Sequence, residues 1–340
     1  MNYILSICLI ISFLVVLYIT PWSIRYLRRI KLIVKDQNKK DKPLVPLSGG
    51  MSVLSGFFMG IMIFIFLNTF FPNGEKLILS EKVLMLLLSS LISIIMITLV
   101  GFVDDILIRD DNESSTGLKQ WQKPLLTLVA AVPLMVVNSG IREIAFPILG
   151  VIDTGLLYPL IIIPIGVIGA ANMVNLLAGL NGLETGIGII SIGMLALYSY
   201  FHIEDAYQAE RTAALIISSL IFASLLAFYF FNKYPAKILP GDSLTYLIGG
   251  ALASIAIIGN LERVTIIVSI PFFIEFFLKL RGKFNKHSYG FYENGKVKSF
   301  YKKAYSIPHL FTMTGKFTEK QVVYIILGIE LFFSSLIWVI

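Results

Sequence analysis

Charge, cysteine and histidine are scarce in this chain of 340 residues, and each scarcity excludes a class of protein. Only 14% of the residues are charged, whereas an ordinary soluble domain carries about a quarter. The single cysteine, Cys8, excludes an internal disulfide. The three histidines, at 202, 287 and 309, show no metal-ligand spacing, which argues against a zinc site. With 56% hydrophobic residues and a mean hydropathy of +0.82, the chain is predicted to be a polytopic membrane protein.

Ten apolar stretches come close to the length of about 20 residues that an α-helix needs to cross a bilayer. They predict an all-α protein with one integral membrane domain over residues 1–340 and helices near 4–21, 50–71, 83–103, 124–138, 156–175, 185–201, 212–231, 243–259, 263–280 and 322–340. Residues 4–20 follow no basic residue and precede no small-x-small cleavage site. They are therefore predicted to be a retained helix rather than a signal peptide.

The positions of the 28 lysines and arginines predict the orientation of the chain. Only five of them, Lys76, Lys82, Arg142, Arg211 and Arg263, fall outside one alternating set of loops. By the positive-inside rule this set faces the cytoplasm and both termini are extracytoplasmic. The cytoplasmic loops are then 22–49, 104–123, 176–184, 232–242 and 281–321. The positive-inside distribution explains the net charge of +7, so no nucleic-acid partner is expected. The expected surroundings of the chain are membrane lipid.

Two adjacent acids, Asp104 and Asp105 in GFVDDIL, end the third predicted helix at the cytoplasmic face. Adjacent helical side chains point about 100° apart, so at most one of the two faces a given neighbour, and two roles are more natural than one. Carboxylates at a helix C-terminus are disfavoured by the helix dipole, which predicts a compensating cation nearby. The alternative is an acidic pair that only marks the membrane boundary.

Three asparagines in NMVNLLAGLNGLETG close another apolar run, where amides are costly without partners. Asn172 and Asn175 share one helical face, and Asn181 lies beyond the expected end of the helix. In LPGDSLTY, Asp242 opens the eighth predicted helix. An amide oxygen and a lone carboxylate are a typical protein share of a Mg²⁺ shell that substrate phosphates and water complete. Amides that pair across helices, and simple helix capping by Asp242, are the alternatives.

The last long loop carries basic groups that could clamp a pyrophosphate. Those nearest the ninth predicted helix are Arg281, Lys283, Lys286 and His287. A loop made basic by the topology rule, or by contact with anionic lipid, is the alternative for each lysine. All the candidate chemistry therefore lies at one face of the membrane.

Three motifs in this order, GFVDDIL, NMVNLLAGLNGLETG and LPGDSLTYLIGG, resemble the polyprenyl-phosphate N-acetylhexosamine-1-phosphate transferase superfamily. The resemblance spans nearly the whole chain. It implies about ten transmembrane helices and a cytoplasmic active site that uses Mg²⁺, with Mn²⁺ as a substitute. AGLNGLE and ENGKVKSFYKKAYSIPHLF are similar to the eukaryotic-type branch that acts on UDP-GlcNAc and dolichyl phosphate, whereas VPLSGGMS looks more like a bacterial motif. This mixture indicates an archaeal enzyme in a prokaryotic cell membrane.

The resemblance also implies roles for individual residues. Asn175 and Asp242 would hold Mg²⁺, and Asp104 and Asp105 would act on the lipid phosphate or shape the site. Lys123 is similar to the family lysine that meets phosphate oxygens. The substrate-binding residues expected are Asn172, Asn181, Glu184, Arg281, Lys283, Lys286 and His287. Of these, Asn181 and its neighbours would read the uridine, and the basic loop around Lys286 and His287 would contact the pyrophosphate and sugar.

Some positions depart from the family pattern. Ile108 stands at the third acid of the bacterial DDxxD motif, while Asp110 and Asp111 are displaced. Lys123 follows the acidic pair at a longer spacing than in the eukaryotic-type branch. Leu239 stands where an aromatic residue beside the uracil is common, which leaves base stacking at that position in question.

The reaction implied is attack by the phosphate of a polyprenyl or dolichyl phosphate on the β-phosphorus of UDP-GlcNAc. UMP leaves and GlcNAc-diphospho-lipid forms, as the first membrane step of glycan assembly, here expected to be N-glycan assembly. Another UDP-N-acetylhexosamine, for cell-envelope polysaccharide, is one alternative. A transporter of lipid-linked or nucleotide sugars is a second, although the chain shows no internal repeat and little charge near the midplane. A homodimer is expected only by analogy with the family.

Overall fold

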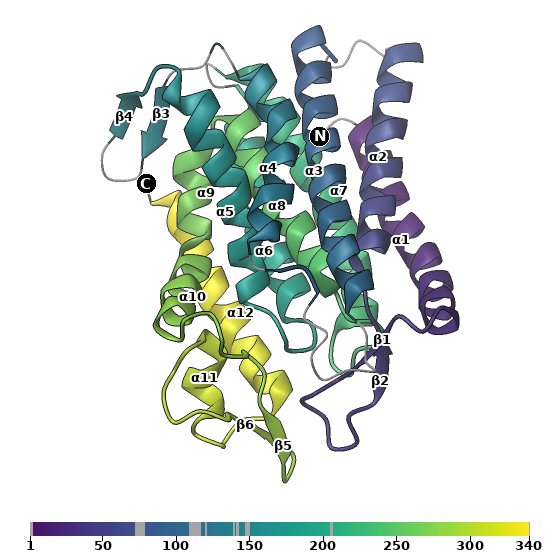
Figure 1. Ribbon diagram of the computed structural model, residues 1–340. Helices are drawn as coiled ribbons and strands as arrows, with labels where there is room; N and C mark the ends of the chain where they lie inside the picture. The colour runs from purple at the N-terminus through teal and green to yellow at the C-terminus, as the bar shows by residue number, and fades with distance from the viewer. Residues whose placement is uncertain are drawn as a thin grey trace.

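The computed structural model describes residues 3–71, 79–108, 117–119, 121–138, 140, 143–146, 150–204 and 207–339. Within these ranges the chain forms a helical bundle with three two-stranded hairpins (Figure 1). Eight of the described helices are long and apolar enough to cross a bilayer, which confirms the predicted all-α membrane class. Asp110 and Asp111, within the predicted loop 104–123, lie outside the described residues.

Successive long helices run in opposite directions (Figure 1). The helices are α1 (Tyr3–Arg29), α2 (Gly50–Phe70), α3 (Glu81–Leu107), α4 (Gln122–Val137), the π-helical turn η1 (Tyr158–Ile162) with α5 (Ile163–Leu176), α6 (Leu183–Phe201), α7 (Gln208–Asn232), α8 (Gly241–Gly259), α9 (Glu262–Val268), α10 (Ile270–Arg281), α11 (Ile307–Thr312), and α12 (Glu319–Ser335) with the 3₁₀ turn η2 (Leu336–Trp338). The antiparallel hairpins are β1 (Ile33–Lys35) with β2 (Leu44–Pro46), β3 (Glu143–Phe146) with β4 (Gly150–Asp153), and β5 (Phe291–Glu293) with β6 (Lys296–Lys298).

The two ends of the bundle carry different hairpins and short helices. We call the end at which α3 and α5 finish and α8 begins the site end. The hairpins β1–β2 and β5–β6 and the short helix α11 lie at this end, the lower one in Figure 1, whereas β3–β4 lies at the opposite end. The predicted loops 22–49 and 281–321 therefore share one end of the molecule with the predicted acids and amides.

Each of the ten predicted apolar stretches is helical, but two of them are not single long helices. The fourth forms α4, which has 16 residues. The ninth is divided at Ser269 into α9 and α10. Pro271 explains the division, because proline has no N–H to donate and its ring clashes with the preceding helical turn. A count of ten membrane crossings, and the predicted orientation, stay predictions.

Helix α8 lies at the centre of the bundle and is buried along nearly its whole length among α3, α5 and α7. Glycines permit this close packing. A Cβ at Gly249 would lie 2.5 Å from the backbone oxygen of Ala170, and a Cβ at Gly101 would lie 2.4 Å from that of Asp242. In lipid the hydrophobic effect does not drive helices together. They associate instead through close packing, which small residues permit. The first turn of α8 is thereby held against α3, and the middle of α8 against α5.

Candidate active site

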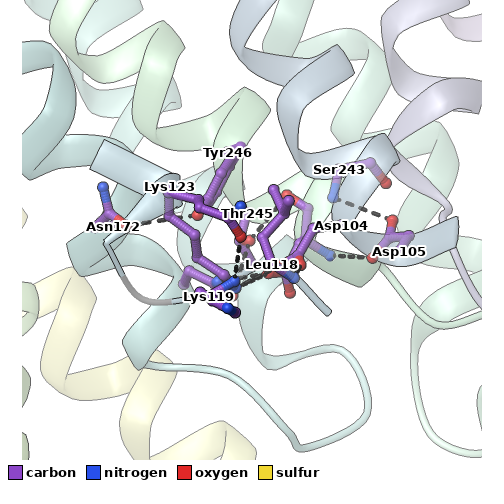
Figure 2. Close-up of polar contacts among 12 residues, drawn as sticks. Asp104, Asp105, Leu118, Lys119, Lys123, Asn172, Ser243, Thr245 and Tyr246 are labelled. Carbon is purple, nitrogen blue, oxygen red and sulfur yellow. Dashed lines mark hydrogen bonds and ion pairs between the residues drawn. The ribbon is translucent and has the colours of Figure 1, made fainter. Parts of the chain in front are cut away.

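Three charged side chains from three helices meet at the site end. Lys123, in the first turn of α4, forms an ion pair with Asp104 of α3 (Figure 2) and another with Asp242 of α8. Its Nζ lies 2.9 Å from Asp242 Oδ2, and Asp104 also accepts a hydrogen bond from the Leu118 N–H. A cation between two carboxylates offsets their mutual repulsion and the unfavourable dipole at the end of α3. Lys123 is therefore the cation that the acidic pair predicted.

Asn175, in the last turn of α5, joins this cluster through Asp242. Its Nδ2 donates to Asp242 Oδ2 at 2.9 Å, and its Oδ1 accepts from Thr245 Oγ1 at 3.1 Å. Asn172 lies one turn earlier, where it donates to a carbonyl of its own helix at 2.8 Å and accepts from the Tyr246 hydroxyl at 3.4 Å (Figure 2). The two amides thus have different surroundings, one charged and one neutral.

Asp105 holds the start of α8 instead of pairing with Lys123. Its Oδ1 accepts from the Asp242 N–H at 2.7 Å and its Oδ2 accepts from the Ser243 N–H at 3.2 Å (Figure 2). Gly241 makes room for this carboxylate: its φ is +72°, and a Cβ there would lie 2.4 Å from Asp105 Oδ2. Free N–H groups at a helix N-terminus stabilise an anion. The adjacent acids have different partners, as their 100° spacing predicts.

The loop between α5 and α6 is fixed through Asn181. Its N–H donates to Glu319 at the start of α12 at 2.8 Å, and its Oδ1 accepts from the Ala236 N–H at 3.0 Å. Glu319 also pairs with Lys39 of the β1–β2 loop, whose Nζ lies 3.2 Å from Asp36. Four chain segments therefore meet around this asparagine, and its side-chain oxygen already has a partner in the protein.

Two further side chains hold the same loop at Gly179. Glu184 accepts from the Gly179 N–H at 2.7 Å through Oε1. Asn38 donates to the Gly179 carbonyl at 2.7 Å and accepts from the Gly290 N–H at 3.0 Å. Asn38 and Glu319 were not predicted, because their partners lie more than a hundred residues away and neither residue stands in a recognisable motif.

Two cavities of different character open beside these residues. A polar cavity of about 220 Å³ is lined by Asn175, Asp242, Asn181 and Glu184, together with residues of the β1–β2 and α7–α8 loops. An apolar groove of about 850 Å³ is lined mainly by aliphatic and phenylalanine side chains of α5, α8, α9 and α10, and also by Lys123 and Asn172. Asn175 lines both. The cluster around Asp242 therefore stands where a polar and an apolar cavity adjoin.

The oxygen atoms at this point suit a hard divalent cation. Asn175 and Asp242 present an amide and a carboxylate side by side, and the Asp242 side chain is 19% exposed. Mg²⁺ takes one or two protein oxygens and completes its octahedron with waters and substrate phosphates. Within the described ranges, no three or more His, Cys, Asp or Glu side chains are grouped so that they could hold a metal. The residues fit magnesium.

Comparison with known proteins identifies the family. The model of glycosyl transferase family 4 matches residues 87–260, from α3 to α8. A provisionally named UDP-N-acetylglucosamine–dolichyl-phosphate N-acetylglucosaminephosphotransferase of Saccharolobus solfataricus is 37% identical over 96% of this chain and 93% of its own length. The chain belongs to glycosyl transferase family 4. It is a membrane-embedded transferase.

Two further relatives are similar to this chain, and one of them is named for a different sugar substrate. The protein of the same provisional name from Sulfolobus acidocaldarius is 33% identical over 96% of this chain and 93% of its own length. A phospho-N-acetylmuramoyl-pentapeptide-transferase of Halalkalibacterium halodurans is 33% identical over 80% of each chain. The matched family segment contains Asp104, Lys123, Asn175 and Asp242, so the convergent cluster lies within the part of the chain that defines family 4.

The predicted basic residues at the end of α10 and just after it lie beyond the matched segment, and none of them lines either cavity. Arg281 lies 5.9 Å from the Tyr305 ring, and Lys286 Nζ lies 5.2 Å from the Tyr301 ring. Lys283 and His287 are exposed. A contact of these four residues with pyrophosphate stays a prediction.

A buried network, which sequence reasoning missed, attaches this loop to α10. Glu275 accepts from Ser306 Oγ at 2.6 Å and from the Ile307 N–H at 2.7 Å. Lys279, one turn later, donates to the Lys286 carbonyl at 2.7 Å. Two side chains of α10 therefore hold this loop through hydrogen bonds.

His309 adds a pH-dependent contact to this network. Its Nδ1 accepts from the Tyr305 N–H at 3.1 Å, so its Nε2 carries the proton and donates to the His287 carbonyl at 2.9 Å. Burial, together with the positive charge of Lys279, lowers the pKa of His309 to about 4. The imidazole is therefore neutral in the folded protein at neutral pH.

We expect His309 to make the protein less stable in mild acid. The unfolded state binds the proton near the ordinary pKa of 6.5, whereas the folded state resists it down to about 4. The contribution of neutral His309 to the free energy of unfolding is therefore complete above pH 6.5, and it is lost as the pH falls toward 4. Melting temperatures in detergent at pH 7 and pH 5 should differ more for the wild type than for His309→Leu. Equal differences would contradict this role.

Proposed function

We propose that the protein transfers GlcNAc 1-phosphate from UDP-GlcNAc to a polyprenyl or dolichyl phosphate and releases UMP. One observation carries this proposal: a polar cavity and an apolar groove adjoin at Asn175, beside Asp242 and Lys123. A reaction between a water-soluble sugar nucleotide and a lipid phosphate requires such a junction. The names of the archaeal relatives support the same pair of substrates.

The polar cavity suits the nucleoside part of the donor. Its 220 Å³ is smaller than the roughly 300–1,000 Å³ of cavities that enclose a whole drug-sized ligand, so the sugar would extend out of it. Asn181 and Glu184 line this cavity together with Asp242, which forms an ion pair with Lys123. A donor bound with its uridine near Asn181 would bring its diphosphate to Asp242.

The apolar groove suits an isoprenoid chain. It follows α5 from Asn175 to Tyr158, a distance of about 25 Å at 1.5 Å per helical residue. Its lining is mostly isoleucine, valine, alanine and phenylalanine, and Lys123 stands at its site end. A lipid chain in this groove would therefore place its phosphate beside the ammonium group of Lys123.

The reaction requires two anions to meet, so electrostatic stabilisation is the main task of the site. A lipid-phosphate oxygen forms a bond to the β-phosphorus, the bond from that phosphorus to the UMP oxygen breaks, and UMP leaves with the electron pair. Mg²⁺ held by Asn175 and Asp242 would neutralise charge on the diphosphate. Asp104 orients Lys123 through their ion pair, and Asp105 holds the first turn of α8, which carries Asp242.

The proposal includes a cytoplasmic active site in the cell membrane of an archaeon. The excess of lysine and arginine in the loops at the site end supports this orientation. The Saccharolobus and Sulfolobus relatives support the source. A homodimer stays a prediction by analogy.

The proposal is tested with purified protein, Mg²⁺, a polyprenyl phosphate and a panel of nucleotide sugars. UMP and a GlcNAc-diphospho-lipid should form in equal amounts with UDP-GlcNAc, and neither should form without the lipid. Activity with UDP-N-acetylmuramoyl-pentapeptide alone would favour the reaction named for the Halalkalibacterium relative. Transport of the nucleotide sugar into vesicles without release of UMP would contradict a transferase.

We expect substitutions at the two adjacent acids to differ in their effects. Asp105→Ala leaves one buried and one partly buried N–H group without an acceptor, at up to about 1–3 kcal/mol each, and should lower the melting temperature together with activity. Asp104→Asn leaves α8 held and Lys123 paired with Asp242, so it should lower the rate with little change in melting temperature. Two variants with wild-type rates and melting temperatures would contradict both roles.

A further inference from the structure

The polar cavity is lined by an aromatic side chain that takes no part in binding the metal or the phosphates. Of the described residues that line it, Tyr289 alone is aromatic. Leu47, Leu180 and Leu239 also line the cavity, but they offer no flat π-surface. A nucleobase is flat, and every base can stack on an aromatic ring. The cavity therefore holds a single candidate surface for stacking.

Tyr289 lies in a stretch whose backbone is fixed on both sides of it. Ser288 donates to the Leu176 carbonyl at the end of α5 at 3.2 Å, and the Gly290 N–H donates to Asn38 at 3.0 Å. The preceding carbonyls of Lys286 and His287 accept from the buried side chains of Lys279 and His309. Because the chain is held at three successive residues before Tyr289 and at the residue after it, the Tyr289 side chain is presented in one position.

The side chain of Tyr289 lies against the loop that carries Asn181. A Cβ at Gly179 would lie 3.6 Å from Tyr289 Cβ and 3.7 Å from its Cδ1, and Gly179 has a φ of +110°, which favours glycine. The ring stacks on His287 with centroids 4.8 Å apart and meets Phe300 edge-on at 6.4 Å. Because these contacts already order the ring, stacking on it would cost little conformational entropy.

We propose that Tyr289 is the stacking surface for the uracil of the donor nucleotide. This inference rests on the proposed function, since it concerns how the same cavity binds the nucleotide. Tyr289 supplies the aromatic surface that Leu239 does not. It also gives the loop after α10 a direct role in substrate binding, through one neutral ring rather than through its basic side chains.

The first test is binding of UMP to the purified full-length protein by calorimetry, together with steady-state kinetics. Tyr289→Leu should raise the Kd of UMP and the KM of UDP-GlcNAc by about tenfold to a hundredfold, with kcat changed by less than about threefold. Tyr289→Phe and Tyr289→Trp should bind UMP as the wild type does. Tyr292→Leu, an exposed tyrosine of β5 outside the cavity lining, is the matched control and should change neither constant.

A second measurement uses the unaltered protein. The dihydrouracil analogue of UMP has a puckered base, so it should bind the wild type about tenfold more weakly than UMP does. The same Kd for both nucleotides would overturn the proposal. So would a Tyr289→Leu variant that raises the KM of UDP-GlcNAc but leaves the Kd of UMP unchanged, because the ring would then contact the sugar. If the wild type binds no uridine nucleotide, the proposed function itself fails.

Discussion

Asp242→Ala and Asn175→Ala should each lower the magnesium-dependent release of UMP by about a thousandfold or more, because each removes an oxygen ligand at the reacting diphosphate. The effect should exceed that of any other substitution in the cluster. Asp242 is also the acceptor that Asn175 and Lys123 share, so its loss leaves both donors without that partner. Lys123 keeps its ion pair with Asp104, which should preserve the fold.

The assay measures UMP across a range of Mg²⁺ concentrations, and the residual rate of each variant should no longer rise with added metal. Asn68→Ala is the matched control. Its amide donates to a carbonyl of its own helix, α2, at 2.9 Å, and it lines neither cavity. Full magnesium-dependent activity in both site variants would show that the metal is held elsewhere.

Gly169→Phe should obstruct the apolar groove and raise the KM for a long polyprenyl phosphate by about a hundredfold. Gly169 lies on α5 and lines the groove, and a Cβ there would meet no atom within 4 Å. The new ring therefore enters open space rather than displacing backbone. The ring keeps part of the lipid chain out of the groove, and each CH₂ that is no longer buried weakens binding by about 0.8 kcal/mol. Every 1.4 kcal/mol raises the dissociation constant of the lipid about tenfold.

The kinetic test compares the lipid and nucleotide substrates in the same variant. The Kd of UMP should not change, since Gly169 does not line the polar cavity. Gly328→Phe on α12 is the matched control, because a Cβ at Gly328 also meets no atom within 4 Å but the residue does not line the groove. An unchanged KM for the lipid in Gly169→Phe would mean that the acceptor binds outside the groove.

The sequence predicts the composition of the cluster better than its geometry. Acids, amides and a lysine at the cytoplasmic ends of predicted helices indicate that Asp104, Lys123, Asn175 and Asp242 lie at one end of the bundle. The 100° spacing of Asp104 and Asp105 predicts that they face different partners. It does not predict that Asp105 accepts the first N–H groups of α8, since this depends on close packing of α3 against α8 at Gly101 and Gly241.

The sequence does not predict which loop residues contact one another over long distances along the chain. Asn38 bonds to Gly179 and Gly290, and Tyr289 reaches the polar cavity, only because three loops meet at the site end. No local pattern encodes such a meeting. For the fold, the length of the apolar stretches predicts the helices. Hydropathy does not predict the three short hairpins, because they depend on contacts within loops.

The donor nucleotide and the lipid phosphate should meet at a metal held by Asn175 and Asp242. The most direct measurement is ³¹P relaxation in a complex of the protein with UMP, a polyprenyl phosphate and Mn²⁺, a mixture that lacks the sugar phosphate and so cannot react forward. Mn²⁺ should broaden the phosphorus signals of both ligands at once, and Asp242→Ala should restore both. Broadening of one signal alone, or equal broadening in the variant, would contradict a shared metal at this junction.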